Sequence, residues 1–378
     1  MRVAVITTSR ADYGIYRSLL RELANADDVE YGLLVAGTHL SRRHGYTLAE
    51  IEADGHPVWA SVKTVPENDQ PIDIARATGQ TVSGFAEVYA SLPRPDFVVA
   101  LGDRYEMFGA VAAAVPFGLQ VAHLHGGEKT TGAIDDRFRH AITVMSAIHF
   151  PATERYGQRV AEITGDEAGI FVVGSLAMDD FAVAALPSIE MMRERFGIDF
   201  TKETILVTLH PETVNYRNIG RQAAIFCAAL AELAARYQIV VTLPNADTAG
   251  TEIRAAFNEL AGKSASVILL ENFGKDGYFA AMQYSRMLLG NSSSGLLEAP
   301  SFGKFAINVG SRQAGRERSA NVLDVNYDTQ AILSAVREIE KRDCRYSGNN
   351  VYVKYANAGR RVVTTLREVH RAASMTVR

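Results

Sequence analysis

The sequence predicts an α/β protein with two doubly wound, Rossmann-like domains, each built on a mostly parallel sheet. Short runs rich in Val, Ile and Leu alternate with longer segments of helical period, which is typical of parallel strands covered by helices on both faces. This pattern occurs twice, on either side of a strand-poor segment around residues 176–203. The length of 378 residues also favours two domains, because single cores stop growing at roughly 250–300 residues.

Strands are expected where apolar, β-branched residues cluster. In the first half these runs lie at residues 2–8, 31–37, 96–102 and 120–125. In the second half they lie at 204–210, 237–244, 266–272 and 286–291, and helical stretches are expected at 14–25, 221–237 and 278–285. Near the C-terminus Val362, Leu366 and Val369 share one helical stripe, so a final helix should pack on one of the domains.

Composition and charge predict a soluble, cytoplasmic protein. Hydrophobic residues make up 47% of the chain, and the net charge of −4 excludes a global field that would hold nucleic acid or an anionic membrane. The longest uncharged stretch, residues 107–122, is too short for a membrane span, and the N-terminus lacks the pattern of a signal peptide. Cys227 and Cys344 lie far apart and indicate neither a disulfide framework nor a metal site.

Polar residues follow the first-half strands, and ligands of open α/β sheets bind beyond the carboxyl ends of the strands. TTSRADYG carries Arg10 into a helix and suits a phosphate-binding turn or, equally, a capped helix with a surface arginine. In residues 37–47, Arg42, Arg43 and two histidines fit a solvated loop better than a lid over an anion. Asp103 ends the third strand, where a role as a cleft carboxylate is favoured over a helix N-cap.

The segment HLHGGEKTTGAIDDRFRHAIT, residues 123–143, concentrates titratable groups. His123 and His125 alternate along a strand and are expected on the same face. Two histidines could begin a metal site, but no further Cys or His cluster lies at a useful spacing. Metal catalysis is therefore not expected.

Acids follow in the same segment. The Gly126–Gly127 turn delivers Glu128, and Asp135 and Asp136 begin an expected helix that carries Arg139 one turn further on. Acids at a helix N-terminus with a base at i+4 also stabilise an ordinary helix. That interpretation does not explain why the turn brings Glu128 and the two aspartates to one sheet edge.

Two stretches of the second half carry polar groups. His210 ends a strand, and a lone histidine in that place is more often structural than catalytic. The turn GNSSSG, residues 290–295, presents hydroxyl and backbone N–H groups that suit a phosphate, and Glu298 one turn later could accept from a ribose. The turn is neither a Walker P-loop nor a GxGxxG fingerprint.

Taken together, SRADYG, LGDRYE, HLHGGE, IDDRFRHAIT, GNSSSGLLEAPS and GSRQAGR resemble the hydrolysing nucleotide-sugar 2-epimerases. The motifs fall in order between residues 7 and 316, so the resemblance covers nearly the whole chain. It implies a glycosyltransferase-B type fold with the active site in the interdomain cleft, and a homodimer. It also implies sugar-binding and catalytic acids in residues 1–178, nucleotide binding in 179–357, and a C-terminal helix, 358–378, that packs back on the first domain.

The resemblance implies a reaction without metal or redox cofactor. Anti elimination of the nucleoside diphosphate across C1–C2 gives a glycal, and syn addition of water gives the 2-epimer, so several acid/base groups are needed. The product would serve nonulosonic acid biosynthesis of the legionaminic or sialic type. The motif matches are Asp103 and Asp135 as acid/base groups, His210 in the second domain, Arg10, Ser292, Ser293, Ser294 and Gly295 around the diphosphate, Glu298 at the ribose and Phe273 near the base.

One position departs from the N-acetylglucosamine enzymes of this family. They are expected to carry a glutamate where this chain has His125, so either His125 is the base or Glu128 takes over that role. The HxHGGE form is associated with enzymes for 2,4-diacetamido-2,4,6-trideoxy sugars, which favours the diacetylbacillosamine nucleotide as substrate. UDP-N-acetylglucosamine is the alternative substrate, a glycosyltransferase of the same fold is the alternative enzyme class, and the choice between UDP and GDP stays open.

Overall fold

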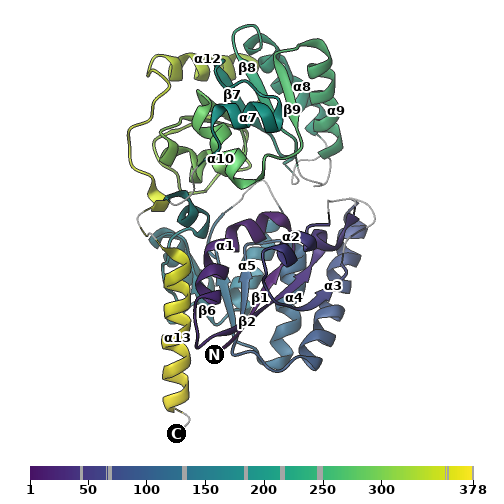
Figure 1. The fold of residues 1–378 in the computed structure, drawn as a ribbon, viewed down its shortest axis with the longest axis vertical. Coiled ribbons are helices and arrows are strands. Elements are labelled where there is room, and N and C mark those ends of the chain that lie inside the picture. Colours follow the sequence, from purple (N-terminus) through teal and green to yellow (C-terminus); the bar gives the residue numbers. More distant parts are fainter. Residues whose placement is uncertain are drawn as a thin grey trace. The chain divides into compact units, whose positions relative to one another are not determined.

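Two six-stranded parallel sheets organise the chain in a computed structural model (Figure 1). The structure describes residues 1–378 except 43–45, 65, 67–69, 130–133, 183–185, 213–217, 245–249, 354, 356 and 377–378. The first compact unit comprises Met1–Glu128, Asp135–Val183 and Tyr352–Arg378, and the second comprises Lys129–Ile134 and Ala184–Val351. The expected pair of doubly wound α/β domains is confirmed.

The first sheet has the strand order β3-β2-β1-β4-β5-β6. Its strands are β1 (Arg2–Thr7), β2 (Glu30–Ala36), β3 (Val58–Val62), β4 (Phe97–Leu101), β5 (Val121–Leu124) and β6 (Ile148–Phe150). The four strands expected in this half are confirmed. Sequence patterning missed β3 and β6 because both are short strands at the edges of the sheet, where long apolar runs are not required.

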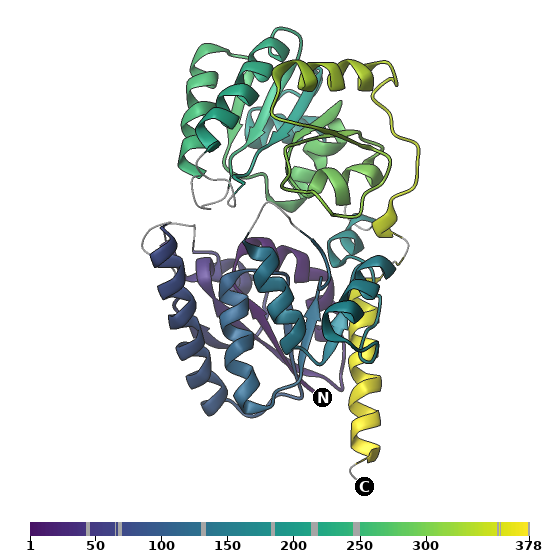
Figure 2. The ribbon, with the colours of Figure 1, turned by 180° about the vertical axis from the view of Figure 1, so that it is seen from behind.

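Helices cover both faces of this sheet. They are α1 (Arg10–Ala24), α2 (Leu48–Ala53), α3 (Pro71–Ser91), α4 (Tyr105–Ala114), α5 (Asp135–Met145), α6 (Glu154–Thr164) and α13 (Ala358–Thr376). One apolar cluster joins α1 and α13 to the sheet, and another joins α3 and α4 to the opposite face. In α13, drawn yellow in Figure 2, Val362 and Leu366 are fully buried and Val369 packs against the same cluster.

The second sheet repeats this topology, with the order β12-β11-β10-β7-β8-β9. Its elements are β7 (Thr204–Thr208), β8 (Gln238–Thr242), β9 (Val267–Leu270), β10 (Met287–Gly290), β11 (Ala306–Val309), β12 (Val322–Val325), α7 (Ile189–Phe196), α8 (Ile219–Leu233), α9 (Gly250–Lys263), α10 (Gly274–Tyr284), α11 (Ser294–Leu297) and α12 (Thr329–Glu340). The four strands expected here are confirmed, and β11 and β12 were missed.

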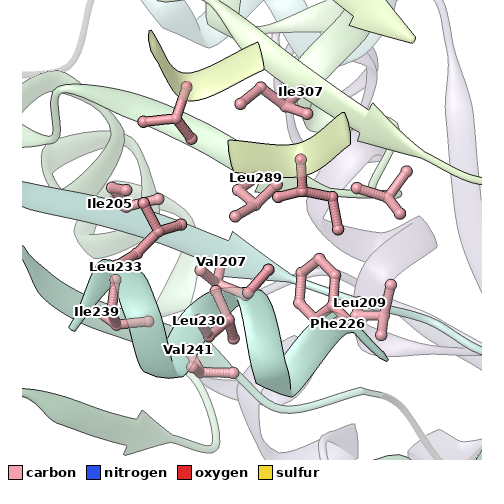
Figure 3. Packing of buried hydrophobic residues seen from close by; sticks show 14 of the residues in the cluster. Ile205, Val207, Leu209, Phe226, Leu230, Leu233, Ile239, Val241, Leu289 and Ile307 are labelled. Carbon is pink, nitrogen blue, oxygen red and sulfur yellow. The ribbon is translucent and has the colours of Figure 1, made fainter. Parts of the chain in front are cut away.

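The larger apolar cluster of the second unit joins its sheet to α8, α9 and α12, and a second cluster joins the sheet to α7 and α10. Phe226, Leu230 and Leu233 of α8 pack against apolar side chains of the sheet such as Val207 and Leu289 (Figure 3). Cys227, on the same helix, is only partly buried, and burial raises the pKa of its thiol to about 11. Across the part of the chain that the structure describes, no helix has the length and hydropathy needed to cross a membrane.

Strand order reverses direction between β1 and β4 in the first sheet and between β7 and β10 in the second. Loops that leave the carboxyl ends of such neighbouring strands run to opposite faces of the sheet and leave a crevice for ligands. The fold therefore places residues for chemistry at the carboxyl ends of these four strands and of the strands beside them, such as β5.

Candidate active site

The turn between β1 and α1 forms a capped helix start. Ser9 is the N-cap of α1, and its side chain and that of Asp12 form a reciprocal capping box. Arg10 begins the helix and lies 3.3 Å from Glu50 of α2 through Nη2 and Oε1, with both side chains about half-exposed. The capped helix with a surface arginine is thus present, with Arg10 in an ion pair, and phosphate binding at this turn stays a prediction.

Asp103 lies two residues beyond β4 and accepts a hydrogen bond from Nη2 of Arg139. Arg139 comes from α5, is almost fully buried, and also lies 3.9 Å from Asp136 through Nη1 and Oδ1. The N-cap position of α4 belongs to Arg104, so the N-cap alternative for Asp103 is wrong. The carboxyl end of β4 and the start of α5 thus place acids around one buried guanidinium. The sequence predicted acids at neighbouring strand ends, but not that Arg139 lies between them.

A second charged pair beside Asp103 was not anticipated. Glu106 is completely buried in the first turn of α4 and accepts hydrogen bonds from Nε of Arg104 at 3.1 Å and from Nη2 at 2.9 Å. The available signal was an acid that opens the otherwise apolar helix YEMFGAVAAA.

His123 is a structural residue of β5. Its Nε2 lies 2.9 Å from the carbonyl oxygen of Gly102 and its Nδ1 lies 3.2 Å from Oγ1 of Thr143. Burial, helped by nearby His149 and Arg139, lowers the pKa of His123 to about 3, although the hydrogen bond that the Gly102 carbonyl accepts opposes this, so the ring is neutral near pH 7. Among the described residues, no group of three or more His, Cys, Asp or Glu side chains is arranged to hold a metal ion.

His125 and Glu128 form a buried dyad. Nδ1 of His125 lies 2.6 Å from Oε1 of Glu128, and the two side chains are 10% and 3% exposed. The strand ends at Leu124 and His125 has a left-handed φ of 61°, so the expectation that His123 and His125 share a strand face is wrong. The backbone needs Gly127 next, because a Cβ there would collide with the carbonyl oxygen of Tyr156.

Asp135 and Asp136 begin α5, as expected, and both are half-buried. Residues 130–133, between the Gly-Gly turn and α5, lie outside the described residues. The first unit therefore brings together Asp103, the His125–Glu128 dyad and the start of α5 at the carboxyl ends of β4 and β5.

His210 follows β7, and the side chain of Asn291 holds its backbone in place. The amide of His210 donates to Oδ1 of Asn291 at 2.7 Å, and Nδ2 of Asn291 donates to the carbonyl oxygen of His210 at 2.8 Å. Nε2 of Gln313 donates to the backbone carbonyl of Asn291 at 2.8 Å. Sequence analysis missed Asn291 and Gln313, although both lie within motifs that it singled out.

The serine turn after β10 lies in a small pocket of the second unit that Thr208, Tyr278 and Asn308 also line. The Ser294 hydroxyl lies 2.7 Å from the Tyr278 hydroxyl and 2.9 Å from Oγ of Ser292. Close packing shapes this turn, because a Cβ on Gly290 would overlap the carbonyl oxygen of Thr208. The turn thus offers several hydroxyl groups in one place.

The other residues predicted in this half lie at the serine turn and its helix or, for Phe273, in an apolar cluster. Ser293 and Gly295 belong to the turn and to α11, and Glu298 follows α11 in a half-buried position. Phe273 precedes α10, but its ring is 4% exposed and packs edge-on against Phe196 at 5.0 Å in an apolar cluster.

Known proteins resemble the chain over nearly its whole length. A UDP-N,N'-diacetylbacillosamine 2-epimerase (hydrolyzing) of Legionella pneumophila is 37% identical over 92% of this chain and 91% of its own. The polysialic acid biosynthesis protein P7 of Escherichia coli is 32% identical over 89% of this chain and 85% of its own.

Solved structures share the fold. The UDP-GlcNAc 2-epimerase from Neisseria meningitidis, solved bound to UDP-GlcNAc, has a TM-score of 0.83 at 20% identity and covers 97% of this chain and 100% of its own. The model of the UDP-N-acetylglucosamine 2-epimerase family matches residues 21–367. With that match and a relative 37% identical over 92% of the chain, this protein belongs to the UDP-N-acetylglucosamine 2-epimerase family.

Proposed function

We propose that this protein is a hydrolysing nucleotide-sugar 2-epimerase whose substrate is a nucleoside-diphosphate-linked 2,4-diacetamido-2,4,6-trideoxy sugar. The products are the nucleoside diphosphate and the 2-epimer with a manno configuration. The observation that carries the proposal is the cluster of proton-transferring groups at the carboxyl ends of β4 and β5, Asp103 with Arg139 and His125 with Glu128. The identity with the Legionella relative supports the choice of sugar.

Epimerisation at C2 explains why one acid/base group is not enough. In the elimination the C2–H and C1–O bonds break, the diphosphate leaves with the electron pair, and C1 and C2 become doubly bonded. In the hydration water supplies a hydroxyl to C1 and a proton returns to C2 on the face opposite to the one it left. Two proton carriers on opposite faces of the ring are therefore needed, and Asp103, Asp135 and the His125–Glu128 dyad are the candidates.

The dyad suggests how His125 serves where a glutamate was expected. Glu128 holds Nδ1, which orients the ring and leaves Nε2 as the nitrogen that exchanges protons. Nε2 is buried and has no hydrogen-bond partner among the described residues. In this proposal Glu128 orients the imidazole and His125 carries the proton.

The second unit supplies the nucleotide site in this proposal. The hydroxyls of Ser292, Ser293 and Ser294 and the backbone at Gly295 bind the departing diphosphate, whose charge grows as the C1–O bond breaks. Glu298 accepts from the ribose, Phe273 supports the base from behind, and His210 assists the leaving group. Arg10 adds a cation from the first unit, and no metal or redox cofactor takes part.

Product analysis tests this function. The purified protein is incubated in D2O with UDP- and GDP-linked diacetamido sugars and with UDP-N-acetylglucosamine, without a sugar acceptor, and products are followed by NMR. We expect nucleoside diphosphate and a 2-epimerised sugar with deuterium at C2. A product without deuterium contradicts the elimination, nucleotide release only with an added acceptor indicates a glycosyltransferase, and turnover of UDP-N-acetylglucosamine alone changes the assigned substrate.

The remaining part of the proposal concerns the setting. The similarity to the polysialic acid biosynthesis protein supports a role in nonulosonic acid biosynthesis of the legionaminic or sialic type. We place the enzyme in the cytoplasm as a homodimer. Sedimentation of the purified protein at micromolar concentration should give twice the chain mass of 41.1 kDa, and a single-chain mass contradicts the dimer.

A further inference from the structure

A chain of buried polar side chains lies beneath the carboxyl ends of β1 and β2. Its central members are Asp12 of α1, 5% exposed, and His39, completely buried after β2. A buried carboxylate is costly unless donors satisfy it, so the contacts of Asp12 show what the chain does.

Asp12 holds the β1–α1 turn through its donors. Oδ1 accepts from the Thr7 hydroxyl at 2.5 Å, and Oδ2 accepts from the backbone amide of Thr8 at 2.9 Å and from its hydroxyl at 2.7 Å. The amide of Ser9 donates to the same carboxylate at 3.1 Å. Burial alone would raise the pKa of Asp12, but the interactions with His39, Thr7 and Thr8 outweigh it and lower that pKa.

The direction of the hydrogen bonds follows from the single hydrogen of the Thr7 hydroxyl. That hydrogen goes to Asp12, so Nε2 of His39, 2.9 Å from the Thr7 oxygen, must carry a proton and donate. Nδ1 of His39 lies 2.7 Å from the Thr47 hydroxyl. The chain therefore runs from Asp12 through Thr7 and His39 to Thr47.

The two ends of this chain each begin a helix. At one end, Ser9 caps α1 and Arg10 is the first residue of that helix. At the other end, Thr47 precedes α2, and its hydroxyl makes no cap for α2. Arg10 and Glu50, which these helices carry, are the ion pair described above.

We propose that Asp12 and His39 are positioning residues that fix the starts of α1 and α2, so that Arg10 rests against Glu50 and exchanges it for the substrate diphosphate. This inference rests on the proposed function. The amides of Thr8 and Ser9 already donate to Asp12, and Arg10 carries the positive charge of this turn, so its guanidinium is the group that binds the anion. Asp12 and His39 act through Arg10 and do not touch the substrate.

A double-mutant cycle between Asp12→Asn and Arg10→Gln tests the inference. Asp12→Asn removes the charge and places an NH2 group among donors, which loosens the turn. We expect KM and the Kd for UDP to rise by roughly tenfold with kcat nearly unchanged, as for lost uniform binding. In the Arg10→Gln background Asp12→Asn should change KM and Kd very little further, because the guanidinium through which Asp12 acts is absent.

Two further variants separate positioning from a loss of stability. His39→Gln keeps a donor toward Thr7 and should give a smaller change of the same kind. Val363→Ala removes buried apolar contacts from α13 of the same unit, lowers Tm, and should leave KM and Kd unchanged. Equal effects of Asp12→Asn with and without Arg10, or an equal rise of KM in Val363→Ala, overturn the inference.

The two proposals fail separately. If the wild-type protein releases no nucleoside diphosphate from any sugar nucleotide, the proposed function is wrong. The cycle is then read from the calorimetric Kd for UDP, which requires no turnover, and non-additivity there still supports the positioning role. Turnover with an additive cycle keeps the function and removes the role of Asp12.

Discussion

The two units have the same sheet topology but differ in the kind of polar side chain that they bury. Among the described residues of the first unit, the buried Asp, Glu, His and Arg side chains are Asp12, His39, Glu106, His123, His125, Glu128, Arg139 and His149. In the described part of the second unit, one Asp, Glu, His, Lys or Arg side chain is buried, Glu212, beside five neutral amides, Gln238, Asn291, Asn308, Gln313 and Asn321. The two units thus share one topology, but the first buries mostly side chains that can gain or lose a proton, and the second buries mostly neutral amides.

The difference matches the two tasks of the proposed reaction. Proton transfer at C2 needs groups that change charge. Because electrostatic interactions are stronger in a buried, low-dielectric site, the positions of these groups relative to one another affect the reaction strongly. Binding of a nucleoside diphosphate needs donors that keep their geometry at every pH, which amides and hydroxyls do. Even Glu212 serves the backbone, since it accepts from the Ser311 amide at 2.8 Å and from its hydroxyl at 2.9 Å.

The largest effect should come from removing one proton carrier. Asp103→Asn keeps the shape of the side chain but cannot take a proton, so kcat should fall by roughly 10²- to 10⁴-fold while the Kd for UDP stays within about twofold. Stopped assays of nucleotide release and calorimetry measure the two quantities. Asp96→Asn at the opposite end of β4 is the matched control, because Asp96 serves the backbone amide of Arg2 at 2.6 Å. Near-normal turnover of Asp103→Asn removes Asp103 from the catalytic set.

Acid should destabilise the first unit before the second. Burial lowers the pKa of His149 to about 4, as it lowers that of His123 to about 3, from 6.5 in both cases. Well above pH 6.5 both rings are neutral in the folded and in the unfolded chain. As the pH falls through 6.5, the unfolded chain takes up protons first. The free energy of unfolding should therefore decline between about pH 6.5 and 3, by up to about 1.4 kcal/mol per pH unit for each histidine.

Tryptophan fluorescence distinguishes the unfolding of the first unit at acid pH from the unfolding of the second unit. The single tryptophan, Trp59, lies in the first unit with the Arg2 guanidinium 4.3 Å from the centre of its ring. Its emission in urea titrations at several pH values follows the first unit, and hydrogen exchange of α8 and β7 follows the second. His123→Asn should flatten the pH slope of the first unit. If both units lose stability equally at acid pH, the difference in their buried side chains does not affect their stability in the way expected here.

Local patterns predicted this architecture, while the contacts within the site depend on distant partners. Val3–Ile6 and Val98–Ala100 are buried on both faces, and their apolar runs marked the parallel sheets from the sequence. The polar positions after these strands followed from the same logic, which is why Asp103 could be singled out. His125 was placed wrongly because alternation assumes that the strand continues, and here it ends one residue earlier.

Pairings across long sequence separations gave no local signal. Asp12 and His39 meet through Thr7, and Asn291 holds the backbone of His210 81 positions away. Each of these residues has an ordinary local role, as a helix cap, a buried ring or a turn amide. Only the close approach of β1 with β2 and of β7 with β10 gives them their partners.

A negative charge in place of the buried amide of Asn291 should weaken nucleotide binding. The effect should be smaller than that of Asp103→Asn on kcat. Asn291→Asp loses the Nδ2 donor and sets a carboxylate against the carbonyl of His210, so the strand ends should separate and the Kd for UDP should rise by about tenfold. Gln238→Glu, a buried amide at the amino end of β8, is the matched control and should cost stability alone. If both variants change Tm but neither changes Kd, neutral amides do not shape the nucleotide site.

The smallest effect should come from the exposed pair that restrains Arg10. Glu50→Gln removes the carboxylate with which a diphosphate must compete, and an exposed ion pair contributes only about 0.5 kcal/mol, so KM should fall by about twofold with kcat unchanged. The change should shrink at high salt, because screening weakens the pair in the wild-type protein first. Glu30→Gln, which breaks the pair of Arg2 and Glu30 at the amino ends of the same sheet, should leave KM alone. A rise in KM for Glu50→Gln would mean that Glu50 aligns Arg10 for the anion. The Arg10 guanidinium of the first unit would then be held in a fixed geometry, as the serine hydroxyls of the second unit are.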